Sequence, residues 1–142
     1  MSDPLHDLYQ SIILDHNKRP RNYGKPGTCT HSAEGYNPLC GDKVTVFLTM
    51  EGGRIKKVNF ESASCAICKA SASIMTELLR DRSLQEMEAI CGLVYEWLLA
   101  DHDKPAALST NGDLAALAGV RQFPARVKCA LLPWETVMKV EY

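Results

Sequence analysis

Hydrophobic residues change their spacing several times along the chain, and each change marks a predicted element. Near the start they recur every three or four residues, which is helical spacing, at Leu5, Leu8, Ile12 and Ile13. Asp3 and Pro4 suit the cap and the first position of that helix, and Pro20 ends it. From Pro20 to Asp42 the Pro, Gly, Asn and Ser content predicts a loop.

A change to alternating positions then predicts a β-hairpin. One face of the first strand carries Val44, Val46, Leu48 and Met50, and the other carries Thr45, Phe47 and Thr49. Gly52 and Gly53 turn the chain, and the β-rich run from Ile55 to Phe60 returns as the second strand.

Helical patterns dominate the remainder. The apolar run from Cys65 to Leu79 predicts a buried helix, and Ser83 and Glu86 have capping-box spacing before another helix that reaches Leu99. A loop from Asp101 to Gly112 and a short turn at 114–117 precede a last helix, predicted from Pro124 to about Val140. Pro133 lies inside it and predicts a kink or a free carbonyl at Cys129.

Composition narrows the class of protein. A chain of 142 residues with 46% hydrophobic content predicts one domain over 1–142 with a real core. A net charge of −1 gives no electrostatic footprint for nucleic acid. Neither a signal-like start nor an apolar run of about 18 residues is present, which predicts a cytoplasmic protein without a membrane span.

The six cysteines then suggest metal or sulfur chemistry, because thiols in a reducing cytoplasm rarely form structural disulfides. Cys40 lies in the loop before the hairpin, Cys65 at the start of a helix and Cys129 in the last helix. Asp42 adds an oxygen donor two residues after Cys40. If the fold gathers these four residues, they suit tetrahedral zinc or an iron-sulfur cluster.

Cys65 and Cys68 also form a CxxC pair at a helix start, which is the thioredoxin-type redox pattern. The antiparallel hairpin before them argues against that fold, so Cys68 is predicted to pack inside the helix, with an auxiliary sulfur-handling role left open. Cys29 and Cys91 belong to no motif. The four histidines, none in a ligand-like pair, are predicted to be structural or surface residues: His6, His16, His31 and His102.

Three segments carry a resemblance to a known family: Asn37-Pro38-Leu39-Cys40-Gly41-Asp42, Cys65 to Ser73, and Phe123-Pro124-Ala125-Arg126-Val127-Lys128-Cys129-Ala130. They resemble, in order and spacing, the signature segments of the SufU/IscU (NifU N-terminal-like) family of iron-sulfur cluster assembly proteins. Lys128 stands where the IscU branch has a histidine, so the chain is more similar to the SufU branch. The resemblance implies an α+β domain with a small antiparallel three-stranded sheet packed against helices, the third strand coming from the region before Cys40.

For the site, the resemblance implies zinc held by Cys40, Asp42, Cys65 and Cys129. It also implies that Cys40 accepts persulfide sulfur from a SufS-type cysteine desulfurase. Zinc would keep the thiolates deprotonated without redox side reactions. Arg126, one helical turn before Cys129, is a candidate catalytic residue that could pair with Asp42 and help to release it or stabilise the thiolates.

Three functions follow from this reading. The first is a zinc-dependent sulfurtransferase that stimulates the desulfurase and passes sulfur onward. The second is a scaffold that uses Cys40, Cys65 and Cys129 to assemble a transient [2Fe-2S] or [4Fe-4S] cluster for acceptor proteins; Lys128 in place of a histidine weakens it, although Asp42 could substitute. The third, a structural zinc domain that regulates a partner, ranks last because a closed site needs no labile carboxylate.

Overall fold

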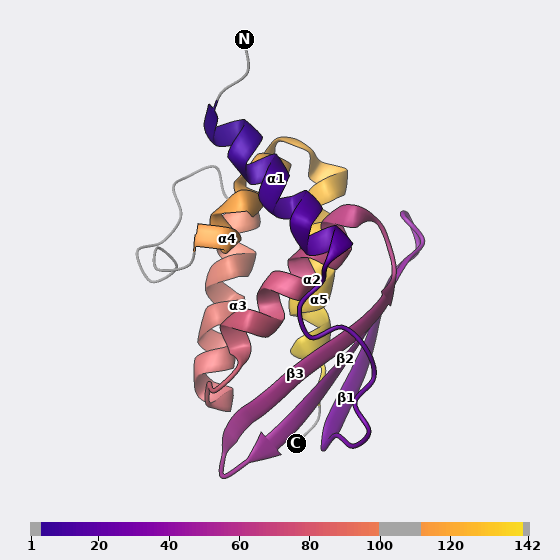
Figure 1. Cartoon of the computed structure of the whole chain (residues 1–142), viewed down its shortest axis with the longest axis vertical. Coiled ribbons are helices and arrows are strands. Elements are labelled where there is room, and N and C mark those ends of the chain that lie inside the picture. Colours follow the sequence, from indigo (N-terminus) through magenta and orange to yellow (C-terminus); the bar gives the residue numbers. More distant parts are fainter. Residues whose placement is uncertain (1–3, 100–111, 141–142) are drawn as a thin grey trace.

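The computed structural model describes residues 4–99 and 112–140. Their elements, in chain order, are α1 (Pro4–Lys18), β1 (His31–Asn37), β2 (Asp42–Glu51), β3 (Arg54–Ala63), α2 (Ala66–Leu79), α3 (Leu84–Leu99), α4 (Gly112–Ala115), the 3-10 helix η2 (Ala116–Gln122) and α5 (Pro124–Val137) (Figure 1). The fold is α+β with a three-stranded antiparallel sheet, as predicted.

The sheet has the order β1-β2-β3, and the predicted hairpin forms β2 and β3. Val44, Val46 and Leu48 of β2 are completely buried on the inner face. At the far edge, the segment around Tyr23 pairs with β3, where the Gly24 N–H donates to the Phe60 carbonyl at 2.8 Å. The chain before the sheet is therefore tied to it by backbone hydrogen bonds.

Strand β1 lies inside the region predicted as a loop, so that prediction is wrong for residues 31–37. Its seven residues are mostly small or polar and include Gly35, so no run of large apolar side chains marks the strand. The third strand implied by the family resemblance is confirmed at this place.

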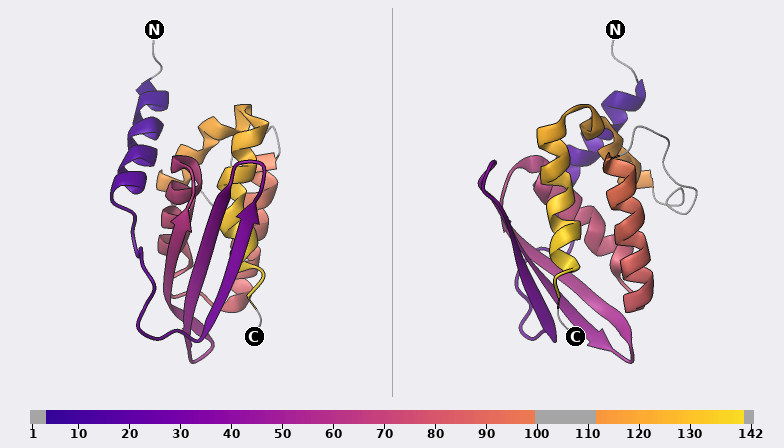
Figure 2. Two further views of the ribbon diagram at one scale, coloured as in Figure 1. Left: turned by 90° about the vertical axis from the view of Figure 1, so that its right-hand side faces the viewer. Right: turned by 180° about the vertical axis from the view of Figure 1, so that it is seen from behind.

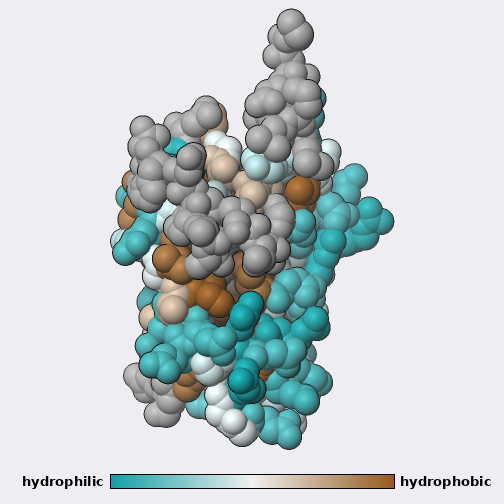
Figure 3. Space-filling view, turned by 90° about the vertical axis from the view of Figure 1, so that its left-hand side faces the viewer, coloured by the Kyte–Doolittle hydropathy of each residue, from teal (hydrophilic) through white to brown (hydrophobic). Residues whose placement is uncertain are grey.

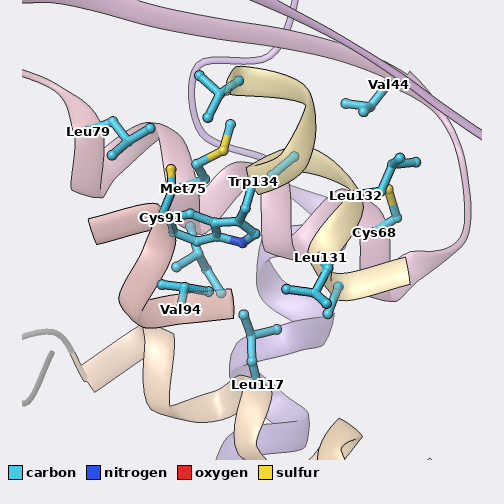
Figure 4. Close-up of a cluster of buried hydrophobic side chains, with 14 of the residues drawn as sticks. Val44, Cys68, Met75, Leu79, Cys91, Val94, Leu117, Leu131, Leu132 and Trp134 are labelled. Carbon is cyan, nitrogen blue, oxygen red and sulfur yellow. The ribbon is translucent and has the colours of Figure 1, made fainter. Parts of the chain in front are cut away.

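Helices cover one face of the sheet (Figure 2). Helices α2 and α5 pack directly on the strands, α1 packs against α2, and α3 packs against α5. The largest fully buried side chains include Trp97, Trp134 and Phe60. Figure 4 shows Trp134 surrounded by apolar side chains of the neighbouring helices. Its indole N–H donates to the Ser71 hydroxyl at 2.9 Å, and that hydroxyl donates to the Ala130 carbonyl, which ties α5 to α2.

Most helix boundaries follow the predictions. The Ser83 N–H donates to the Glu86 carboxylate at 3.0 Å and the Glu86 N–H to the Ser83 hydroxyl at 3.1 Å, so the capping box is confirmed. Helix α5 continues through Pro133 but ends at Val137, earlier than expected. The turn predicted at 114–117 is part of a longer helical stretch, α4 and η2. Asp3, His102 and most of the predicted loop before Gly112 lie outside the described residues.

His16 has the structural role that was predicted for it. Its ring is 2% exposed, with Nδ1 at 2.7 Å from the Ser73 hydroxyl and Nε2 at 2.8 Å from the Asp113 carboxylate. These contacts join α1 to α2 and α4. Ser73 is itself completely buried, whereas the Asp113 side chain is 51% exposed, so the buried imidazole connects α2 to a carboxylate at the surface.

The surface beside α3 and α4 is mixed. Figure 3 shows apolar side chains reaching the surface there in small groups among polar ones. Leu99, at the end of α3, is 56% exposed. Within residues 4–99 and 112–140, the helices are too short or too polar to span a bilayer.

Candidate metal centre

Cys40 and Asp42 lie at the turn between β1 and β2. Asn37 and Asp42 form the last pair of the two strands, and the Cys40 N–H donates to the Asn37 carbonyl at 3.3 Å. Gly41 has a φ of 70°, a conformation that residues with side chains rarely adopt, and it turns the chain between the two donors. Cys40 is exposed at the tip, whereas Asp42 is 1% exposed.

Cys65 is the residue that caps α2. Its sulfur accepts the Cys68 N–H at 3.5 Å, and its own N–H donates to Asp42 Oδ1 at 2.9 Å. The Cys65 sulfur also lies 3.7 Å from Asp42 Oδ2. Unpaired N–H groups and the dipole make a helix start favourable for negative charge, and here that position receives both a thiol and a carboxylate.

Cys129 completes the group from the second turn of α5. It is fully buried, with its sulfur 3.4 Å from that of Cys40. Burial raises the pKa of the Cys129 thiol, and its contacts with Asp42, Cys40 and Cys65 raise that pKa further. The causes of the shift therefore connect Cys129 with all three other candidate ligands.

Three separate segments thus meet near one end of the sheet: the β1–β2 turn, the start of α2 and the start of α5 (Figure 1). Donor atoms of Cys40, Asp42 and Cys129 lie within 4.8 Å of one another. Cys65 lies outside that group and is linked to it by its two contacts with Asp42. Two sulfurs on one tetrahedral zinc lie about 3.8 Å apart, given a Zn–S distance of about 2.3 Å. The observed sulfur separation of 3.4 Å is close to that geometry.

The chemistry of this donor set fits a metal. Burial is the largest cause of the raised pKa of Cys129, and the neighbouring Asp42, Cys40 and Cys65 groups raise it further. Without a cation, three thiolates and a carboxylate this close together would repel one another. A divalent zinc ion would reverse that repulsion and hold the thiols deprotonated. The same soft sulfur donors also suit an iron-sulfur cluster.

Arg126 is at the first turn of α5 and is exposed. It lines a hollow of about 330 Å³, together with Tyr9, Ile67 and Phe123, beside the candidate ligands. Among the ion pairs of the described residues, none joins Arg126 to Asp42. The pairing of these two residues stays a prediction.

The remaining cysteines are in different surroundings. The Cys68 and Cys91 thiols lie in the hydrophobic core. Burial raises the pKa of each to about 12. Cys29 is exposed and outside the group of donors. The sequence analysis missed Asn37, whose amide is buried beside Cys40; its place immediately before Pro38 in the first signature segment was the available signal.

Comparison with known proteins connects this geometry to a family. The family model described as NifU-like N terminal domain matches residues 8–130. The chain belongs to this family. The resemblance carried by the three cysteine segments is thereby confirmed, and with it membership of the SufU/IscU group of iron-sulfur cluster assembly proteins.

Relatives include both branches of the group. The chain is 33% identical over 136 residues to the zinc-dependent sulfurtransferase SufU of Bacillus subtilis, covering 95% of this chain and 90% of that protein. It is 31% identical over 133 residues to the iron-sulfur cluster assembly scaffold protein IscU of Streptococcus pyogenes, covering 94% and 82%. A crystal structure of a putative SUF-system scaffold protein from Fervidobacterium islandicum matches with a TM-score of 0.81 at 32% identity, covering 94% of this chain and 96% of that one.

Proposed function

We propose that this protein is a zinc-dependent sulfurtransferase, which accepts persulfide sulfur on Cys40 from a SufS-type cysteine desulfurase and stimulates that enzyme. The observation that carries the proposal is the unequal exposure of the donors. Cys40 is exposed on a hairpin turn, while Asp42 and Cys129 are buried beside it. The similarity to a protein named a zinc-dependent sulfurtransferase supports the same assignment.

A zinc ion held by Cys40, Asp42, Cys65 and Cys129 would be a cation without redox chemistry, and it would keep the thiols ionised. The chain itself provides the acceptor. The Cys40 thiolate attacks the outer sulfur of the desulfurase persulfide, a new S–S bond forms, and the old S–S bond breaks with its electron pair left on the desulfurase cysteine. The position of Cys40 at the hairpin tip allows a partner's cysteine to reach it.

A second candidate is the scaffold function, favoured by the similarity to a protein named as an IscU scaffold. In that case an iron-sulfur cluster is cargo, held by Cys40, Cys65 and Cys129 and delivered to acceptor proteins. Either function requires free thiols, which a reducing cytoplasm preserves, so a cytoplasmic location is part of the proposal.

Metal content separates the two candidates. Elemental analysis and visible absorption would be recorded for the anaerobically purified wild type and the Asp42→Ala variant. We expect about one zinc per chain and no chromophore. A brown protein with iron and sulfide, longer-lived in Asp42→Ala, would favour the scaffold. The acceptor role has its own test: Cys40→Ser should abolish stimulation of a SufS-type desulfurase, and unchanged stimulation would refute it.

A further inference from the structure

Cys40 lies in the wall of a small hollow. Its volume is about 240 Å³, and it is lined by Asn37, Leu39, Cys40, Pro124, Ala125 and Lys128. The lining is largely apolar except for the Asn37 amide, the Cys40 thiol and the Lys128 ammonium. A second hollow of about 260 Å³ also has Asn37 and Lys128 in its wall, so these two side chains lie between the two spaces.

The side-chain NH2 group of Asn37, a residue in the wall of this hollow, is a hydrogen-bond donor without an acceptor among the described residues. The residue is 9% exposed, and its Oδ1 accepts the Leu39 N–H at 3.2 Å. That bond identifies the oxygen end of the amide, so the other end is the NH2 group. Nδ2 is buried and has no hydrogen-bond partner among residues 4–99 and 112–140. A buried donor without a partner is costly, which makes a ligand that accepts its hydrogen bond the natural explanation.

Lys128 adds a positive charge to the same wall. It is exposed on α5, one residue before Cys129, and it takes part in none of the ion pairs found among the described residues. An amide donor and one ammonium group beside a nucleophilic sulfur can together stabilise a single negative charge.

We propose that this hollow holds the outer sulfur of a persulfide on Cys40, with Asn37 Nδ2 donating a hydrogen bond to that sulfur and Lys128 supplying the opposing charge. The inference rests on the proposed function and extends it. After the transfer, Cys40 carries an S–SH group that loses its proton to water, and the negative charge then lies on the outer sulfur. No oxidant or reductant is required, because one S–S bond replaces another.

The other lining residues favour sulfur over an oxyanion. Leu39, Pro124 and Ala125 offer apolar contacts, which suit a large, polarisable atom that is weakly hydrated. A carboxylate or phosphate group presents several strong acceptor oxygens and would need more donors than one amide and one ammonium.

The test loads the full chain with inorganic polysulfide and follows the Cys40 persulfide by differential alkylation and peptide mass spectrometry during treatment with cyanide. Asn37→Asp keeps the oxygen that accepts the Leu39 N–H but replaces the NH2 donor by a second carboxylate oxygen. We expect this variant to lose the sulfur about tenfold faster than wild type, because a hydrogen bond to a charged group is replaced by repulsion. Lys128→Met should lose it about threefold faster, because an exposed charge contributes less.

Controls are available within the chain. Lys128→Arg keeps the charge and should restore the wild-type rate, and Lys139→Met removes an exposed lysine beyond the end of α5 and should change nothing. Thermal unfolding and zinc content check that each variant is folded. Equal lifetimes for wild type, Asn37→Asp and Lys128→Met would overturn the inference. So would a wild-type chain that carries persulfide on the exposed Cys29 but none on Cys40.

A parallel loading with a SufS-type desulfurase and cysteine separates this inference from the proposed function. If the chemically loaded persulfide depends on Asn37 and Lys128 but the desulfurase never loads Cys40, the hollow is supported and the sulfurtransferase function is refuted. If the desulfurase loads Cys40 and the variants behave as wild type, the function stands and the hollow is refuted.

Discussion

Cys129 and Cys91 are both buried thiols with a raised pKa, yet they lie in two very different regions. Cys129 is 0% exposed in the candidate metal centre and contacts Cys40 and Asp42. Cys91 is 4% exposed in the helical core, where Figure 4 shows it beside Trp134 and the apolar side chains around it. Burial alone therefore does not make a thiol a ligand; several donors must meet at one place.

The two regions also differ in how their polar groups are satisfied. In the core, the Trp134 indole, the Ser71 hydroxyl and the Ala130 carbonyl form a closed chain of hydrogen bonds. At the candidate metal centre, the Cys129 thiol faces the Cys40 thiol, and the Asn37 NH2 group has no partner in the described part of the chain. The core groups are therefore satisfied by other protein groups, whereas the thiols of the candidate centre would be satisfied by the proposed zinc.

The largest expected effect is on zinc affinity. It is tested by removing one thiol from each region in turn. Cys129→Ala should weaken zinc binding about a hundredfold or more, because four ligands share the large binding energy of a structural zinc site. Cys91→Ala removes an equally buried thiol and should leave zinc affinity unchanged. Competition with a chelating dye measures both. Equal affinities for the two variants would remove Cys129 from the ligand set.

The comparison also shows what the sequence could and could not reveal. Three cysteines and Asp42 were chosen as ligands from motifs, and the alternation of β2 predicted the β2–β3 hairpin, whose first strand begins at Asp42. Strand β1 could not be found from hydrophobic pattern, because its role is a close approach of small residues to α5. The unpaired Asn37 amide is equally invisible in a sequence, since a missing partner is a property of the packed turn.

Truncating the core should have the next largest effect. Trp134→Ala removes a side chain that is 1% exposed and should lower the free energy of unfolding by about 3–5 kcal/mol. Trp134→Phe keeps most of the bulk but removes the donor to Ser71, at a cost of about 1–2 kcal/mol. Urea titration measures both. A loss below about 1 kcal/mol for Trp134→Ala would show that the core can collapse around the cavity.

Gly35 lies where β1 contacts α5. Strand β1 leads into the turn with Cys40, and α5 carries Cys129. A β-carbon at Gly35 would overlap the Thr136 hydroxyl, which is fixed by donating to the Leu132 carbonyl at 2.6 Å. Gly35→Ala should therefore destabilise the fold by about 1–3 kcal/mol and also weaken zinc binding, since β1 must move from α5.

Gly92 provides the matched control. It lies within α3, and a β-carbon there would meet no atom within 4 Å. Gly92→Ala should stabilise the protein by up to about 1 kcal/mol through helix propensity, without an effect on zinc. Thermal and urea unfolding with zinc titration test the pair. The same sign of change in both variants would contradict the packing argument.

The last expected effect concerns pH and again contrasts the core with the candidate metal centre. Burial, followed by the nearby Glu88 carboxylate, raises the pKa of Cys91 from 9.0 to about 12. The folded state therefore keeps this proton at pH values where the unfolded chain releases it, so the stabilisation is complete below pH 9 and is lost between about pH 9 and 12. At pH 10 the loss should be about 1.4 kcal/mol relative to pH 8. Comparing wild type with Cys91→Ala at both pH values isolates this contribution from other titrating groups. If the two proteins had the same pH dependence, the Cys91 thiol would be accessible to water in the folded state. Cys91 would then not be a core thiol, and its contrast with the candidate ligands would be wrong.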